Sequence, residues 1–198
     1  DSGLAPWDVA AGGLLVQDAD LDYDPAEIPE KILSHNLYGI ELDERAGALG
    51  AFALTMKARS RQRRFFNKGI RPNITVLEKV TFSRDELDEY ISAVGRDLFT
   101  QGLRETLLQF AEADNFGSLI VPKVPNVSDL LAMLAAKDMA GNLFLADTHQ
   151  RVLKVLRMAE ALSPRYAVVV ANPPYMGGKG MNPRLSAWAR ETYPSSKS

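Results

Sequence analysis

The 198-residue chain contains no cysteine, so disulfide bonds and cysteine-based metal sites are excluded. Its two histidines, His35 and His149, are far apart in the sequence and do not have the spacing of a metal-binding pair. The chain has no apolar run of roughly 18 residues, and its first residues do not have the pattern of a signal peptide. We therefore expect no bound metal and no membrane partner, and we take a cytoplasmic location as the starting hypothesis.

The net charge of the chain is small, but its charged residues are unevenly distributed along the sequence. Hydrophobic residues make up 46% of the sequence, which is typical of a globular protein, and the formal net charge is −2. Between residues 57 and 71, however, all charged residues are basic, and Arg61, Arg63 and Arg64 lie in the middle of this segment. Such a segment could neutralise nucleic-acid phosphates, or it could be a solvated helix end and loop. The sequence leaves both interpretations open.

The strongest chemical signal is a β-forming run that ends in Asn172-Pro173-Pro174-Tyr175. The run of residues 166–171 predicts a central, buried strand, and the prolines stop it because they fix φ and lack a backbone donor. The Asn172 side chain and the Pro173 carbonyl are then acceptors at the carboxyl end of a strand, where open α/β sheets bind ligands. An amino group on an aromatic ring could donate to both and stack on Tyr175. The alternative is a Pro-Pro turn that only ends a strand.

A second signal is Glu41, at the end of a short buried strand expected over residues 37–42. An acidic residue at this place can accept hydrogen bonds from the vicinal hydroxyls of a ribose. Asp43 follows as a good helix N-cap, and apolar residues then recur at helical spacing: Ala46, Leu49, Phe52, Ala53 and Met56. With a second strand expected over residues 73–80, this order predicts a βαβ unit.

The remaining pattern predicts three parts of one α/β domain. Residues 25–83 form the strand–helix–strand part. Residues 84–145 form a mostly helical insertion, which begins with a capping box at Ser83 and Glu86 and contains a further helix capped by Ser128. Residues 146–198 hold a long helix from about Asp147 to Leu162, the strand over 166–171 and the loop that follows it. One face of this helix carries Val152, Val155, Leu156 and Ala159.

Three segments, residues 36–46, 51–59 and 169–182, resemble motif II and the catalytic loop of large bacterial adenine-specific DNA methyltransferases. These are the enzymes of the phage-growth-limitation, or BREX, kind and the related type II restriction-modification enzymes. The resemblance covers about residues 25–198. It implies an α/β fold with a Rossmann-like class I methyltransferase core that uses S-adenosylmethionine, and methylation of adenine N6 in double-stranded DNA. It also implies that restriction or phage-defence subunits could be partners.

By that likeness, Glu41 would bind the ribose of S-adenosylmethionine, with Asp43 and Glu78 on the same cofactor side. Asn172 and Pro173 would accept hydrogen bonds from the amino group of a flipped adenine, and Tyr175 would stack on the base. The DNA-contacting residues would be Arg61, Arg63, Arg64 and Lys179.

The chain departs from the family at the glycine loop that receives the amino-acid end of the cofactor. The family has Asp-Pro-Ala-Cys-Gly-Ser-Gly, whereas the candidates here are Asp8, Gly12 and Gly13, without the Gly-x-Gly spacing. We therefore expect an incomplete core and read the chain as a fragment of a longer protein. Alone it should be inactive, bind cofactor weakly and self-associate through uncovered apolar faces.

Two alternatives remain at this point. Asn-Pro-Pro-Tyr could serve any planar amine, so the chain could methylate the N5 atom of a protein glutamine. The missing Gly-x-Gly loop would also fit a non-catalytic DNA-binding or scaffold fragment.

Overall fold

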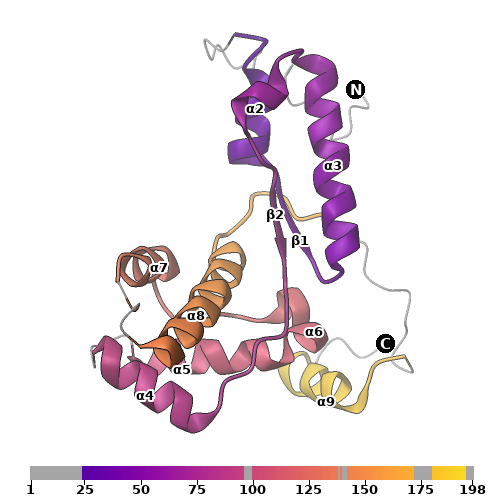
Figure 1. Cartoon of the computed structure of the whole chain (residues 1–198). Helices are drawn as coiled ribbons and strands as arrows, with labels where there is room; N and C mark the ends of the chain where they lie inside the picture. The colour runs from indigo at the N-terminus through magenta and orange to yellow at the C-terminus, as the bar shows by residue number, and fades with distance from the viewer. Residues whose placement is uncertain (1–23, 96–99, 138, 140–141, 172–179, 195–198) are drawn as a thin grey trace. The chain divides into compact units, whose positions relative to one another are not determined.

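The computed structural model describes residues 24–95, 100–137, 139, 142–171 and 180–194. The chain divides into two compact units between Glu78 and Lys79 (Figure 1). The three-part division at residues 83 and 145 remains a prediction. Among the described residues, no helix combines the length and the apolar character that crossing a membrane requires.

The first unit has the strand–helix–strand order that the sequence predicts. Its elements are α2 (Ile28–Lys31), the π-helical turn η1 (Ile32–Asn36), β1 (Tyr38–Glu41), α3 (Glu44–Arg61), the 3-10 turn η2 (Phe65–Lys68) and β2 (Asn73–Val76). β1 and β2 pair in parallel, with Tyr38 opposite Asn73 and Glu41 opposite Val76. β1 is shorter than expected and is only half-buried, so the prediction of a buried strand was wrong in that respect.

Helix α3 packs on this small sheet through its smallest residues. Gly47 lies so close to β2 that a Cβ atom built on it would be 2.8 Å from Val76 Cγ2. Further along the helix, Ala58 is buried in a cluster with Leu33 and Phe65. The side chain of Asn73 ties β2 to η1, because its Nδ2 donates to the Leu33 and Ser34 carbonyls, at 3.0 and 2.9 Å.

The apolar stripe that the sequence spacing identifies on α3 faces outward in the structure. Leu49, Phe52 and Met56 are 67%, 61% and 45% exposed. The spacing correctly predicted the helix, but α3 is apolar on more than one side and the sheet packs on the side that carries Gly47. A close approach of helix to strand is possible only where the helix has no large side chain.

The second unit is helical. Its elements are α4 (Arg84–Val94), α5 (Thr100–Gln109), η3 (Phe110–Glu112), α6 (Ala113–Phe116), η4 (Gly117–Leu119), α7 (Val127–Ala135), α8 (Leu143–Leu162) and α9 (Pro183–Thr192). The predicted capping box of α4 is present: Ser83 Oγ accepts from Glu86 N, and Glu86 Oε2 accepts from Ser83 N, both at 3.2 Å. Asn126 rather than Ser128 caps α7. Helix α8 begins at Leu143, four residues before the predicted Asp147, and Asn142 is its N-cap.

The core of this unit lies around α8. The face predicted for this helix is fully buried, and it consists of Val152, Val155, Leu156 and Ala159. Beside it, the buried Tyr90 of α4 is 2.7 Å from Nδ1 of the buried His149. Burial raises the pKa of the Tyr90 hydroxyl and lowers the pKa of His149, so both groups stay neutral and join α4 to α8.

The predicted strand over residues 166–171 is not formed. These residues have no strand structure, and Val168, Val169 and Val170 are 70%, 75% and 71% exposed. A strand depends on the hydrogen bonds of a neighbouring strand, and β propensity alone does not supply them. The sheet of the described residues consists of β1 and β2. Residues 166–171 therefore have no neighbouring strand among the described residues with which to pair.

Replacing Gly47 by alanine should destabilise the first unit by about 1–3 kcal/mol, because the new methyl group would overlap Val76 Cγ2. Val76 is β-branched and stiff at χ1, so the helix must move outward. Gly50→Ala is the matched control: its methyl group would lie 3.4 Å from Ile74 Cδ1, the end of a flexible side chain. Urea unfolding measures both, and equal stability of the two variants would contradict the close packing of α3 on β2.

Candidate functional site

The parallel pairing of β1 and β2 brings the acidic residues predicted for the first unit to one edge of the sheet. Glu41 is the last residue of β1 and lies opposite Val76, the last residue of β2. Glu78 follows β2 by two residues, and Asp43 follows β1 by two residues. The carboxyl ends of parallel strands are where open α/β sheets bind ligands, so these carboxylates occupy the expected edge.

Glu41 is held in place by backbone amides of Leu42, Asp43 and Leu77. Its carbonyl oxygen accepts a hydrogen bond from Leu77 N at 2.8 Å, which extends the ladder by one residue. Its side chain turns back at the strand end, where Oε1 accepts from Leu42 N at 2.7 Å and from Asp43 N at 3.2 Å. Oε2 makes no hydrogen bond with the described residues, so the carboxylate is fixed through one oxygen and can accept donors through the other.

Asp43 is the N-cap of α3, as the sequence indicated. Its Oδ1 accepts from Arg45 N at 2.8 Å and from Ala46 N at 3.4 Å. The Arg45 side chain, followed by the backbone amides of Arg45 and Ala46, holds the pKa of Asp43 below its usual value. The carboxylate of Asp43 is therefore already engaged in starting the helix, which leaves Glu41 as the better candidate for a ligand.

The basic segment lies at the C-terminal end of α3. Arg61 is the last residue of the helix, and Arg63 and Arg64 follow it; all three are exposed. The buried Phe65 fixes this turn to the core of the unit. Within the described residues these three guanidinium groups form no ion pair, whereas the nearby Lys68 pairs with Glu30. The segment is thus an exposed basic surface, as both sequence interpretations require.

All of the predicted catalytic and glycine-loop residues, and one predicted DNA-contacting residue, Lys179, lie outside the described residues. These are Asp8, Gly12, Gly13, Asn172, Pro173, Pro174, Tyr175 and Lys179. The structure therefore describes only the segments on either side of Asn172-Pro173-Pro174-Tyr175: the exposed run that precedes it and α9 that follows. The described residues contain no group of histidine or acidic side chains placed to hold a metal ion.

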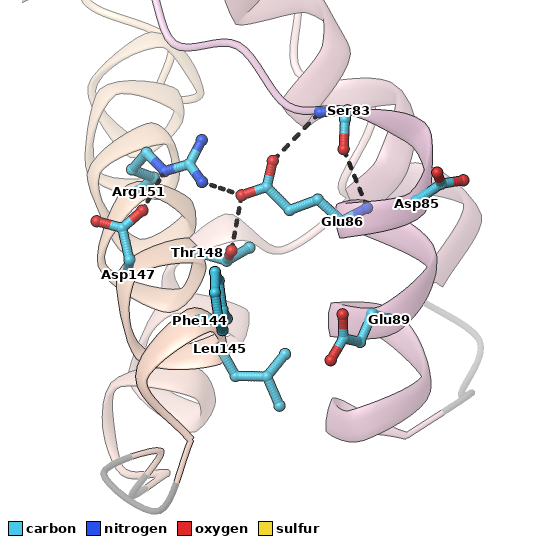
Figure 2. A pocket seen from close by; sticks show the side chains of 9 residues that line it. All are labelled: Ser83, Asp85, Glu86, Glu89, Phe144, Leu145, Asp147, Thr148 and Arg151. Carbon is cyan, nitrogen blue, oxygen red and sulfur yellow. Dashed lines mark hydrogen bonds and ion pairs between the residues drawn. The ribbon is translucent and has the colours of Figure 1, made fainter.

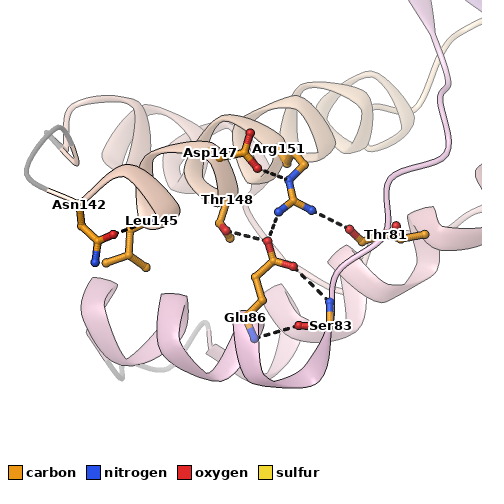
Figure 3. A network of polar contacts seen from close by, with 8 residues as sticks. All are labelled: Thr81, Ser83, Glu86, Asn142, Leu145, Asp147, Thr148 and Arg151. Carbon is orange, nitrogen blue, oxygen red and sulfur yellow. Dashed lines mark hydrogen bonds and ion pairs between the residues drawn. The ribbon is translucent and has the colours of Figure 1, made fainter.

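A pocket of about 560 Å³ lies between α4 and the start of α8, and no predicted site residue lines it (Figure 2). Its walls carry Ser83, Asp85, Glu86, Glu89, Phe144, Leu145, Asp147, Thr148 and Arg151. Figure 3 shows Glu86 at the centre of the polar contacts in this region.

Glu86 closes the cap of α4 and also joins this helix to α8. Its Oε1 accepts from Thr148 Oγ1 at 2.7 Å and pairs with Arg151. Arg151 also donates to the Thr81 carbonyl and to Asp147, at 2.9 Å each (Figure 3). The capping box and the Asp147–Arg151 spacing can be read from the sequence, whereas the Glu86–Arg151 contact depends on the fold. Because both Glu86 oxygens are used in this way, we interpret the network as structural.

Comparisons with known proteins identify the relatives of the chain. Residues 35–198 match the model of the family described as Eco57I restriction-modification methylase. Over 89% of the chain, it is 34% identical to adenine-specific methyltransferase BrxX of Escherichia coli O9:H4 (strain HS). It is 32% identical, again over 89% of the chain, to adenine-specific methyltransferase PglX of Lacticaseibacillus casei (strain Zhang). The matches cover 16% and 15% of these proteins, so the chain spans about a sixth of their length.

The roles of the Asp43 and Glu41 carboxylates can be distinguished by the effect of each substitution on stability. Asp43→Ala should destabilise the first unit by about 0.5–2 kcal/mol, because two amides of the first turn of α3 lose their acceptor. Glu41→Gln should change stability little, because the amide oxygen can still accept from Leu42 N and Asp43 N. Thermal unfolding measures both variants. If Glu41→Gln lost as much stability as Asp43→Ala, the Glu41 carboxylate would have a structural role rather than a ligand-binding one.

Proposed function

Because the chain belongs to the Eco57I restriction-modification methylase family, we propose that it carries catalytic residues of an enzyme that methylates adenine N6 in DNA. The observation that carries this proposal is the continuous family match over residues 35–198, which includes both Glu41 and Asn172-Pro173-Pro174-Tyr175. The names of the two relatives specify adenine, which favours this base over a protein glutamine as the substrate. Restriction-modification or phage defence is the proposed setting.

The proposed fold is a Rossmann-like class I core, of which the βαβ unit of β1, α3 and β2 is one part. The parallel pairing and the carboxylates at the carboxyl edge support this assignment. Glu41 fits the ribose of S-adenosylmethionine, because Oε1 is fixed by the backbone while Oε2 faces no donor among the described residues. Glu78 and Asp43 are proposed as further residues of the cofactor side, and Asp8, Gly12 and Gly13 as the remnant of the glycine loop.

S-adenosylmethionine would supply the methyl group as an electrophile. In the proposed site, the Asn172 side chain and the Pro173 carbonyl accept the two hydrogen bonds of the adenine amino group, and Pro174 fixes the turn that presents them. This pairing would orient the nitrogen lone pair for direct methyl transfer, without a covalent intermediate on the enzyme. Tyr175 stacks on the base once it has left the duplex.

The 198-residue chain alone is proposed to be inactive and to self-associate. The missing Gly-x-Gly spacing supports weak cofactor binding. The exposed Leu49, Phe52 and Met56 on α3 support association through apolar surface. A monomer in light scattering that also binds S-adenosylmethionine at micromolar concentration would contradict both parts of this proposal.

In the complete polypeptide, Asn172→Ala should abolish adenine methylation and leave the affinity for S-adenosylmethionine unchanged, because it removes one of two acceptors that orient the amine. Tyr175→Ala should weaken binding of the flipped base by about 1–3 kcal/mol, because the base no longer stacks on the ring. Methyl transfer to an adenine-containing duplex, with calorimetric titration of cofactor as the control, measures these effects. Near-normal methylation by Asn172→Ala would contradict the role assigned to Asn172.

Reversing the charges of Arg61, Arg63 and Arg64 to glutamate should weaken DNA binding and reduce its salt dependence, by about 0.9 in the logarithmic slope for each phosphate that is no longer neutralised. Reversal of Arg84, Arg157 and Arg190, which are exposed bases of the second unit, is the control with the same change in net charge. Affinity measured across a salt series separates the two. An equal salt slope in both triple variants would show that Arg61, Arg63 and Arg64 do not contact phosphates and would favour the solvated-surface interpretation.

A further inference from the structure

Helix α9 follows the proposed catalytic motif closely and is attached by its first turn to residues 112–116. Six residues, 176–181, separate Tyr175 from Asn182, the N-cap of α9. Asn182 has two roles: its Oδ1 accepts from Leu185 N at 2.8 Å, and its Nδ2 donates to Asn115 Oδ1 at 2.6 Å. One side chain thus starts the helix and links it to a segment 67 positions earlier in the chain.

Arg184, in the first turn of α9, reinforces this link. Its Nε and Nη2 donate to the two carboxylate oxygens of Glu112, each at 3.0 Å, which is a bidentate ion pair. The same guanidinium lies 5.7 Å from the centre of the Phe116 ring. One turn later, Trp188 meets that ring edge-on, at 5.4 Å between centroids. The pair and the ring together hold the guanidinium in one orientation.

The segment to which α9 is attached belongs to the core of the helical unit. Phe110 and Ala113 are fully buried, and the Phe110 carbonyl accepts a hydrogen bond from Val80 N at 3.0 Å. Figure 1 shows α9 (yellow) beside α6. Since this segment is fixed, the contacts at Glu112 and Asn115 fix the start of α9.

The other side of the motif is tied to the same unit. Tyr166 Oη donates to the Ala161 carbonyl, in the last turn of α8, at 2.7 Å. We propose that Glu112, Asn115 and Arg184 are positioning residues: they anchor the start of α9, which begins shortly after the proposed catalytic motif Asn172-Pro173-Pro174-Tyr175. This inference rests on the proposed function of that motif. The three residues act through the backbone and do not touch the substrate.

The size of the effect follows from the exposure of the ion pair. The side chains of Arg184 and Glu112 are 67% and 41% exposed, so salt screens their attraction. We expect loss of the ion pair to speed the hydrogen exchange of amides in α9 by about three- to fivefold at low salt. The effect should become smaller as the ionic strength rises.

Hydrogen exchange of this chain tests the anchor without any need for activity. In Arg184→Ala and Glu112→Gln, amides of residues 182–192 in and before α9 should exchange about three- to fivefold faster, while those of α8 should not change. Combining Glu112→Arg with Arg184→Glu should restore slow exchange, because the ion pair is re-formed with reversed charges. Arg190→Ala, which removes an exposed cation from the same helix, is the control. Exchange in Arg184→Ala that equals the control would overturn the proposal.

Methylation kinetics of the complete polypeptide then test the consequence of the anchor. The two single variants should lower kcat and leave KM for S-adenosylmethionine unchanged, and the charge-reversed pair should recover turnover. A fall in kcat without faster exchange of residues 182–192 would also overturn the proposal. If the parent protein methylates no adenine, the proposed function fails, while the exchange result still decides whether the anchor exists.

Discussion

The parallel pairing of β1 with β2 is the constraint on which the candidate cofactor edge depends. A parallel pair places both carboxyl ends on one side, and the register that sets Glu41 opposite Val76 brings Glu41 and Glu78 to the same edge. The pairing requires α3 to cross the sheet closely, which Gly47 permits because it has no side chain. Asp43 starts α3 shortly after β1, so one short turn both ends the strand and supplies the Leu42 and Asp43 amides that hold Glu41 Oε1.

The helical unit shows a different use of polar groups. In this unit Glu86, Thr148 and Arg151 join α4 to α8, and the neutral pair of Tyr90 and His149 joins the same helices in the core. These five buried or half-buried side chains are tolerated because each has a hydrogen-bond or ion-pair partner. At the surface, the contacts of α9 with residues 112–116 join elements about 70 positions apart.

The run over residues 166–171 shows where inference from pattern reaches its limit. Its composition predicts a buried strand, yet in the structure Val168 to Val170 are exposed and lie in no sheet. The prediction depended on neighbouring strands, and no local property of the run supplies them. The expected geometry of the catalytic motif is therefore not seen in the described residues. Family membership rests on the sequence match alone.

The sequence by itself determined the local features of this protein and its family. The capping box at Ser83 and Glu86, the cap at Asp43 and the buried face of α8 could be predicted, because each depends on residues a few positions apart. The tertiary structure alone decided which side of α3 meets the sheet, that Glu86 pairs with Arg151, and that Arg184 reaches Glu112. These contacts join residues distant in the chain, and which of several compatible surfaces meet is fixed by packing rather than by local spacing.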